Sequence, residues 1–168
     1  MTTATHAGNF VAPTRMLADF GTMLAAGIDP EKFADRCGTS INHPAFTLGH
    51  CTYYLGIAAN TLGASIGCGP DEKRLYAIGV ECVDTPGTYP AKDDVLAAYT
   101  ARCGEVAEFL ESCEDAAFEA PNDDGPFEDR FDSKGQVAAF MVLVHTSFHL
   151  GQISGWRRAV GMGPAMKA

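Results

Sequence analysis

Two histidines lie four residues apart near the end of the chain, at His145 and His149. The stretch around them, from Gly135 to Trp156, contains no Asp, Glu, Lys or Arg. Residues four apart on a helix are neighbours on one face, with Cβ atoms about 5–6 Å apart. Both rings can therefore converge on one ion, as they do in His-x-x-x-His zinc sites. The alternative is that each ring bonds only to a backbone carbonyl or a hydroxyl group in the core.

A third histidine, His50, lies in a second uncharged stretch, from Pro44 to Pro70. On a helix it shares the apolar face of Phe46 and Ile57, so it is predicted to point inward. His43 lies on the same side, but seven residues correspond to about 10 Å along the axis, and metal–nitrogen bonds are only about 2 Å long. The predicted metal ligands are therefore His50, His145 and His149.

This ligand set has a distinctive charge, because neither uncharged stretch supplies a carboxylate. Three neutral imidazoles would leave a divalent ion close to its full charge, with open positions for water or substrate. Three protein ligands plus an open position is the catalytic pattern, whereas structural zinc sites are closed. Such an ion lowers the pKa of bound water or thiol. A hydrolase using water would need a base from another helix, with Asp19, Glu105 and Glu108 as candidates.

Several polar residues flank the predicted ligands. Gln152 faces the same way as His149 and is either a partner that orients a ligand or substrate, or a core amide. Tyr53 and Tyr54 flank the face of His50, and the hydroxyl group of either one is predicted to orient bound water or to have an ordinary role in the core. Cys51 points away from the ligand face and is interpreted as packing. Arg157 and Arg158 are interpreted as favourable charges at a helix C-terminus rather than as an anion site.

The elements that must position these residues are four amphipathic helices, predicted from apolar periodicity. Their approximate ranges are Pro13 to Gly27, Pro44 to Leu62, Lys92 to Glu114 and Ser133 to Val160. Ser40 and Asn42 are the candidate caps of the second helix, Ser133 starts a capping box, and Asp29-Pro30-Glu31 predicts a short extra helix.

The four predicted helices give an all-α fold class. The long connection between the second and third helices indicates a four-helix bundle with one long crossover. The crossover, residues 63–91, is long enough to let those two helices run parallel, and Leu75 to Val83 within it is either a strand or irregular. The acidic segment Glu119 to Asp132 is interpreted as a solvated loop, because it lacks the spacing of a calcium-binding loop.

Composition narrows the class of protein. The chain has 168 residues, which fits a single domain over 1–168, and its net charge of −9 argues against nucleic acid as a partner. Its six cysteines form no Cys-x-x-Cys pair and are interpreted as reduced thiols. The sequence shows no signal peptide and no long apolar run, so we expect a cytoplasmic protein without a membrane partner.

Two stretches, "NHPAFTLGH" and "HTSFHLGQISGWRRAVGMG", resemble the DinB-like/YfiT-like superfamily of metal-binding four-helix bundles. The resemblance implies an up-down-down-up bundle, a nickel or zinc ion held at the positions of His50, His145 and His149, and frequent homodimers. Characterised members include transferases and an isomerase that use low-molecular-weight thiols such as bacillithiol or mycothiol, whereas other members have no known activity. The name does not imply DNA binding.

Three functions follow from these observations. The first is a metal-dependent enzyme that activates a small thiol, as a thiol transferase does, or water, as a hydrolase does. The second is a non-catalytic metal- or ligand-binding bundle of a stress response. The third is a plain bundle whose histidines only satisfy hydrogen bonds in the core.

Overall fold

The computed structural model describes residues 6–166, and all regular secondary structure in that range is helical. The elements are α1 (Val11–Ala25), α2 (Pro44–Thr61), α3 (Pro70–Tyr76), α4 (Lys92–Ser112), α5 (Asp115–Glu119), α6 (Lys134–Ala139) and α7 (Thr146–Ala159). Two 3₁₀ segments, Ala7–Phe10 and Pro30–Lys32, and a π-helical segment, Phe140–His145, complete the set. The all-α class predicted from the sequence is confirmed.

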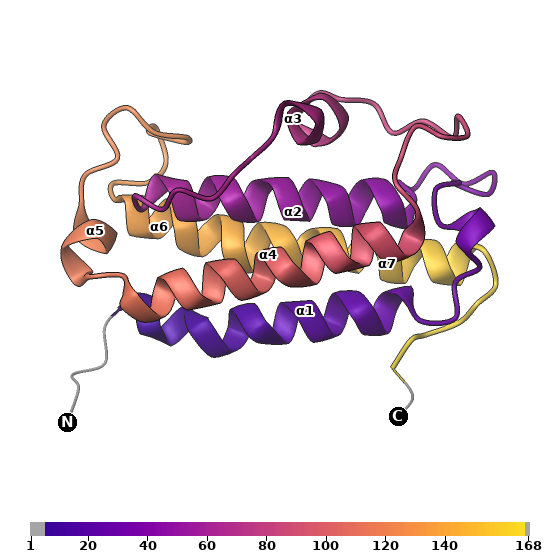
Figure 1. The fold of residues 1–168 in the computed structure, drawn as a ribbon, viewed down its shortest axis with the longest axis horizontal. Coiled ribbons are helices and arrows are strands. Elements are labelled where there is room, and N and C mark those ends of the chain that lie inside the picture. Colours follow the sequence, from indigo (N-terminus) through magenta and orange to yellow (C-terminus); the bar gives the residue numbers. More distant parts are fainter. Residues whose placement is uncertain (1–5, 167–168) are drawn as a thin grey trace.

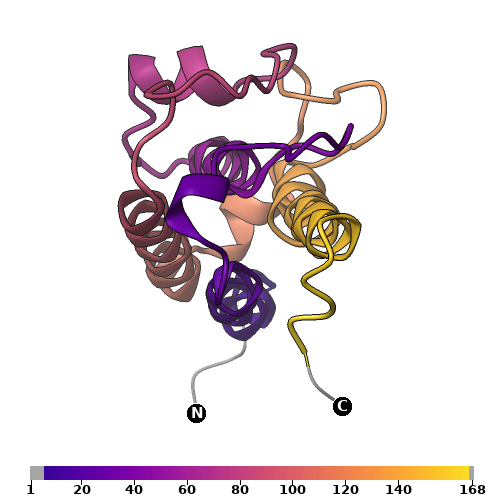
Figure 2. The same ribbon diagram turned by 90° about the vertical axis from the view of Figure 1, so that its right-hand side faces the viewer.

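The long helices lie side by side around a common core (Figures 1 and 2). α1 and the continuous run α6–α7 point one way along the bundle, and α2 and α4 point the other way (Figure 1). α2 and α4 can share a direction because residues 62–91 carry the chain back along the molecule between them. This crossover passes over α2, so it can cover a face of that helix.

α2 begins at Pro44, and its N-cap is His43. The Nδ1 atom of His43 accepts a hydrogen bond of 3.1 Å from the backbone N–H of Phe46, and proline suits the first helical position. The prediction of Ser40 or Asn42 as the cap is therefore wrong. A histidine ring performs the acceptor function for which serine and asparagine are the usual candidates.

α2 is buried along most of its length, because α4, α7 and α3 all pack against it. Leu48 and Leu55 face the main core and are fully buried. On the opposite side, Phe46 and Tyr53 form a smaller apolar cluster with Tyr76 from α3. Burial on all sides explains why the sequence of α2 contains no charge. The segment predicted as a strand or irregular, residues 75–83, contains the end of α3 followed by irregular chain.

The sequence predicted one regular α-helix from Ser133 to Val160. The structure differs, because residues 140–145 form wider π-helical turns between α6 and α7. The hydroxyl group of Thr146 donates a 3.1 Å hydrogen bond to the carbonyl oxygen of Met141, five residues earlier. π-helical turns inside α-helices often occur at functional sites. Here the turn ends at His145, one of the predicted ligands.

All six cysteines are free thiols, and most are buried in the core. The run from Lys134 to Ala159 is long and apolar enough to cross a membrane by length and composition alone. Core helices of soluble proteins meet the same criterion, and this run packs against α1 and α2, so it is weak evidence for a membrane protein.

Candidate metal centre

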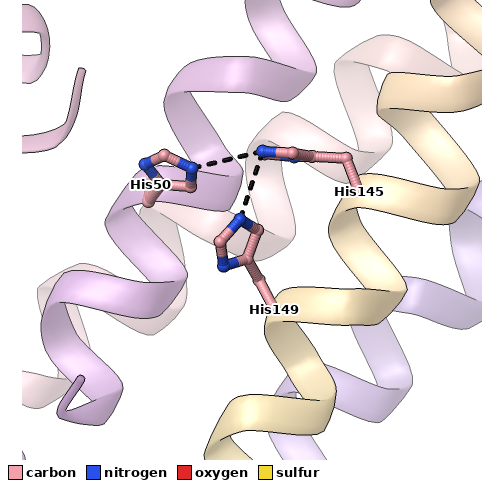
Figure 3. A group of neighbouring side chains, drawn as sticks. All are labelled: His50, His145 and His149. Carbon is pink, nitrogen blue, oxygen red and sulfur yellow. Dashed lines mark hydrogen bonds between the residues drawn. The ribbon is translucent and has the colours of Figure 1, made fainter. Parts of the chain in front are cut away.

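The three predicted ligands lie together between α2 and the last helix (Figure 3). His50 comes from the middle of α2, His145 ends the π-helical segment, and His149 follows one turn later in α7. Their ligand nitrogens all lie within 4.8 Å of one another. The Nε2 atom of His145 is 3.2 Å from the Nε2 atoms of both His50 and His149. Each of the three rings thus directs its Nε2 atom towards the other two.

Hydrogen bonds behind two of the rings determine which nitrogen carries the proton. Nδ1 of His50 lies 2.7 Å from the carbonyl oxygen of Tyr76, and Nδ1 of His149 lies 3.1 Å from Oε1 of Gln152. A carbonyl oxygen can only accept, so each Nδ1 must donate. In a neutral imidazole the other nitrogen then has a free lone pair. Nε2 of His50 and Nε2 of His149 are therefore prepared as ligands.

This arrangement is unfavourable without a cation. Both free lone pairs face Nε2 of His145, which can carry only one hydrogen, so at least one of the two 3.2 Å contacts has no proton in it. In addition, Nδ1 of His145 is buried without a hydrogen-bond partner among the described residues. Nitrogens around one ion at 2.0–2.1 Å lie about 2.8–3.4 Å apart at octahedral or tetrahedral angles, a range that includes both 3.2 Å distances. The cluster could therefore hold a divalent metal ion.

The electrostatics of the three rings favour the form that binds metal. Burial, with repulsion from His149, lowers the pKa of His50 to about 4. Burial, with repulsion from both neighbours, lowers the pKa of His145 to about 3. Burial also lowers the pKa of His149, although the hydrogen bond to Gln152 opposes it. All three imidazoles are therefore neutral near pH 7, as metal ligands must be.

The three histidines are part of the lining of a cavity of about 440 Å³. Tyr54 and Ile57 of α2 line it beside His50, and Phe140 and Met141 line it from the π-helical segment. A π-helix bonds each residue to the fifth along the chain, which brings residues five apart, such as Phe140 and His145, towards the same side. The π-helical segment therefore places the ring of Phe140 and the imidazole of His145 in the lining of the same cavity.

A known protein family matches most of the chain. The family model of the DinB superfamily matches residues 22–153, which include all three histidines. The chain belongs to the DinB superfamily. No curated protein and no solved structure matches the chain. Membership in the DinB superfamily therefore rests on the family model, and the description of the site rests on the structure.

Two further predicted residues of this DinB protein contact the cluster. Gln152 holds His149 through the hydrogen bond described above. The ring of Tyr54 lies 4.7 Å from the ring of His50 and 5.2 Å from that of His145, measured between centroids. Its hydroxyl oxygen accepts a 2.9 Å hydrogen bond from the backbone N–H of Ile78. Tyr54 thus connects the cluster to the crossover.

The other residues considered in the sequence lie elsewhere. His43 caps α2, and its Nε2 atom is 3.1 Å from the carbonyl oxygen of Val83. Arg157 donates to the carbonyl oxygens of Leu24 and Ala26, so it ties α7 to the end of α1. None of the remaining candidates lines the cavity: Asp19, Glu105 and Glu108 are exposed, Cys51 is buried in the main core, and Tyr53 belongs to the smaller cluster.

Sequence reasoning missed the residues that position His50. Tyr76 supplies the carbonyl oxygen that bonds to its Nδ1, and Gly49 lets Tyr76 approach, because a methyl group at Gly49 would overlap the tyrosine ring. Phe127 and Ile78, which line the cavity from the acidic loop and the crossover, were missed too. A glycine directly before a predicted ligand histidine, in a helix predicted to be buried, was the one available signal.

The lowered pKa values predict how the metal-free protein responds to acid. An unfolded chain takes up protons on these histidines below about pH 6.5, whereas the folded protein resists protonation until about pH 4 for His50 and pH 3 for His145. We therefore expect the free energy of unfolding to fall as the pH drops from 6.5 towards 4. Each additional proton bound by the unfolded state contributes about 1.4 kcal/mol per pH unit.

Urea unfolding of chelator-treated protein at a series of pH values measures this dependence. The His145→Gln variant, which lacks one of the titrating groups, should show a shallower slope between pH 6 and 4.5. Equal slopes in both proteins would contradict the assignment of the acid sensitivity to this cluster.

Proposed function

We propose that His50, His145 and His149 hold one divalent ion, nickel or zinc, and that the protein is a metal-dependent enzyme that activates a small thiol. The observation that carries the proposal is the convergence of three Nε2 atoms, two of them with fixed free lone pairs, in the lining of a largely apolar cavity. Structural sites are closed by four protein ligands, whereas three ligands beside a cavity leave room for a substrate.

A divalent ion at this site would act as a Lewis acid and lower the pKa of a thiol or a water molecule that reached it. The protein supplies three neutral ligands and therefore does not offset the charge of the ion. Tyr54 accepts its hydrogen bond from Ile78, which leaves its own hydroxyl hydrogen for a bound substrate. Apart from Tyr54 and the histidines, the walls are apolar, and apolar surroundings strengthen electrostatic interactions because they lower the local dielectric constant.

The lining of the cavity favours a thiol over water as the nucleophile. Among its described lining residues there is no Asp or Glu, and the three candidate bases, Asp19, Glu105 and Glu108, are exposed elsewhere. A thiol has an ordinary pKa of about 8.5, so a modest decrease makes it nucleophilic at neutral pH without a protein base. In the proposed reaction the thiol proton passes to solvent, the sulfur bonds to an electrophilic carbon, and the leaving group departs with its electron pair.

Cobalt substitution tests this proposal. Cobalt-loaded protein mixed with a panel of low-molecular-weight thiols is expected to show a sulfur-to-metal charge-transfer band with release of about one proton per site. The His145→Ala variant should show neither signal. If no thiol changes the spectrum while an ester or amide is hydrolysed, the hydrolase replaces the transferase. If neither occurs in protein that retains the ion, the protein is a non-catalytic binding bundle.

A further inference from the structure

Apart from the histidines and Tyr54, the lining of the cavity is apolar and comes from four separate segments. Ile57 belongs to α2, Ile78 to the crossover, and Phe127 to the acidic loop. Phe140 and Met141 of the π-helical segment complete the wall. Among the described residues that line the cavity there is no Asp, Glu, Lys or Arg. A volume of about 440 Å³ lies within the range of small-molecule sites.

The predicted acidic segment, Glu119 to Asp132, lies almost entirely in the loop between α5 and α6, residues 120–133. This acidic loop is held in a defined conformation and contributes Phe127 to the wall of the cavity. An isolated antiparallel β-bridge between Pro121 and Ser133 joins the two ends of the loop. Inside it, the amide nitrogen of the buried Asn122 side chain donates to the carbonyl oxygens of Pro126, at 3.0 Å, and Phe131, at 3.3 Å. The loop is therefore a structured cover, rather than only a solvated connection as the sequence suggested.

Phe127 occupies a costly conformation in this loop. Its φ of 58° lies in the left-handed region, which bulky residues rarely adopt. The ring packs edge-on against Phe140, with 5.5 Å between centroids, and is 41% exposed. Ile78 on the other wall is 85% exposed, although the hydrogen bond from its backbone N–H to Tyr54 keeps it at the cavity. Both side chains offer apolar surface that a ligand would cover.

The charges of the loop lie outside the cavity. Asp123, Asp124, Glu128 and Asp129 are exposed and line other hollows of the surface. Inside, the walls offer no cation to a carboxylate, and an unpaired buried charge is strongly disfavoured.

We propose that the cavity binds the apolar, uncharged part of the substrate, an alkyl or aryl group, with Phe127 and Ile78 as the residues that determine this specificity. A dry apolar cavity of about 150 Å³ suffices for one benzene ring, so the space here takes a larger group. The inference deepens the proposed function, because this group would be carried by the electrophile that meets the thiol. Binding of the group itself depends on the walls and not on the ion.

The experiment measures binding of straight-chain 1-alkanols, from butanol to heptanol, to the full chain in metal-free and zinc-loaded forms by titration calorimetry. Each added methylene is expected to tighten the Kd about fourfold, from the free energy of burying one methylene group. Carboxylates of equal length should bind the metal-free protein at least about tenfold more weakly than the alcohols.

Two exposed wall residues provide the variants. Phe127→Ser and Ile78→Ser should each weaken hexanol binding at least about fivefold, from the lost apolar contact. Phe148→Ser is the matched control, because Phe148 is 65% exposed and adjacent to His149 but does not line the cavity. It should leave hexanol binding unchanged.

An affinity that is independent of chain length, or that is equally weakened by Phe148→Ser, would overturn the inference. So would carboxylates that bind the metal-free protein as tightly as the alcohols. These outcomes are separate from a failure of the proposed function, in which the alcohols bind as expected while no thiol changes the spectrum of the cobalt-loaded protein.

Discussion

Replacing any one of His50, His145 and His149 by alanine is expected to lower the affinity for zinc or nickel more than about 100-fold. Loss of residues that only support a ligand typically costs 10- to 100-fold, and loss of a ligand should cost more. The effect should be similar at all three positions, because the Nε2 atoms of all three rings meet at one point. Competition with a chromophoric chelator gives the Kd, and mass spectrometry of purified protein without a histidine tag gives the metal content.

His43 is the matched control, because it is a buried histidine on the same helix. Seven residues separate it from His50, which is about 10 Å along the axis. His43→Asn keeps a side-chain acceptor for the first turn of α2 and so keeps the helix cap. This variant should bind metal with nearly the affinity of the wild type. If it loses the ion as completely as His149→Ala does, the site is not the one described.

Loss of metal should not be confused with loss of fold. The bundle has its own core, in which Leu48, Tyr99 and Trp156 are fully buried, so it does not depend on an ion as a zinc finger does. Circular dichroism of the alanine variants should therefore remain helical. A random-coil spectrum for chelator-treated wild type would contradict this account and give the metal a structural role.

The clustering of His50, His145 and His149 could be predicted from the sequence because it depends on local geometry and on charge. The four-residue spacing of His145 and His149 places both rings on one face of any helix, and the absence of charges marks buried segments. The same reasoning separated His50 from His43 by distance along the axis. Both inferences need only the helical repeat and no knowledge of the partners.

The residues that support the site could not be predicted, because they depend on how distant segments pack. The carbonyl oxygen of Tyr76 meets His50 across 26 positions of sequence, and any backbone carbonyl could have done so. The π-helical turn before His145 has no composition that distinguishes it from a regular apolar helix. Phe127 reaches the cavity from a loop whose acidic composition indicates only solvent exposure.

The role of Gly49 depends both on its position in the sequence, directly before His50, and on the packing of distant segments. Its neighbour His50 is a predicted ligand, while the reason for the glycine appears only when α3 is seen to pack on α2. Tyr76 is buried, and its ring lies against Gly49 and contacts the rings of Phe46 and Tyr89. Because the ring is buried and in contact with other rings, we expect it to move away from an added methyl group only together with the backbone of Tyr76.

Gly49→Ala is therefore expected to lower metal affinity about 10- to 100-fold without changing any ligand. The methyl group would push the Tyr76 ring away from α2 and with it the adjacent carbonyl oxygen that fixes the proton on Nδ1 of His50. His50 would then lose the hydrogen bond that aims its Nε2 lone pair at the cluster. The Kd for zinc by chelator competition measures the loss, and circular dichroism checks that the bundle remains folded.

Gly151→Ala is the matched control, because Gly151 also lies in a helix close to a ligand, His149, but an added methyl group there meets nothing within 4 Å. Alanine is also the better helix former, so this variant should bind zinc normally and be slightly more stable. Tyr76→Phe, which keeps the ring and the backbone carbonyl, should bind zinc normally as well. Normal zinc affinity in Gly49→Ala would show that the carbonyl of Tyr76 does not position His50. A loss of affinity in Gly49→Ala alone would identify the contact between α3 and α2 as the part of the fold that prepares this ligand for metal.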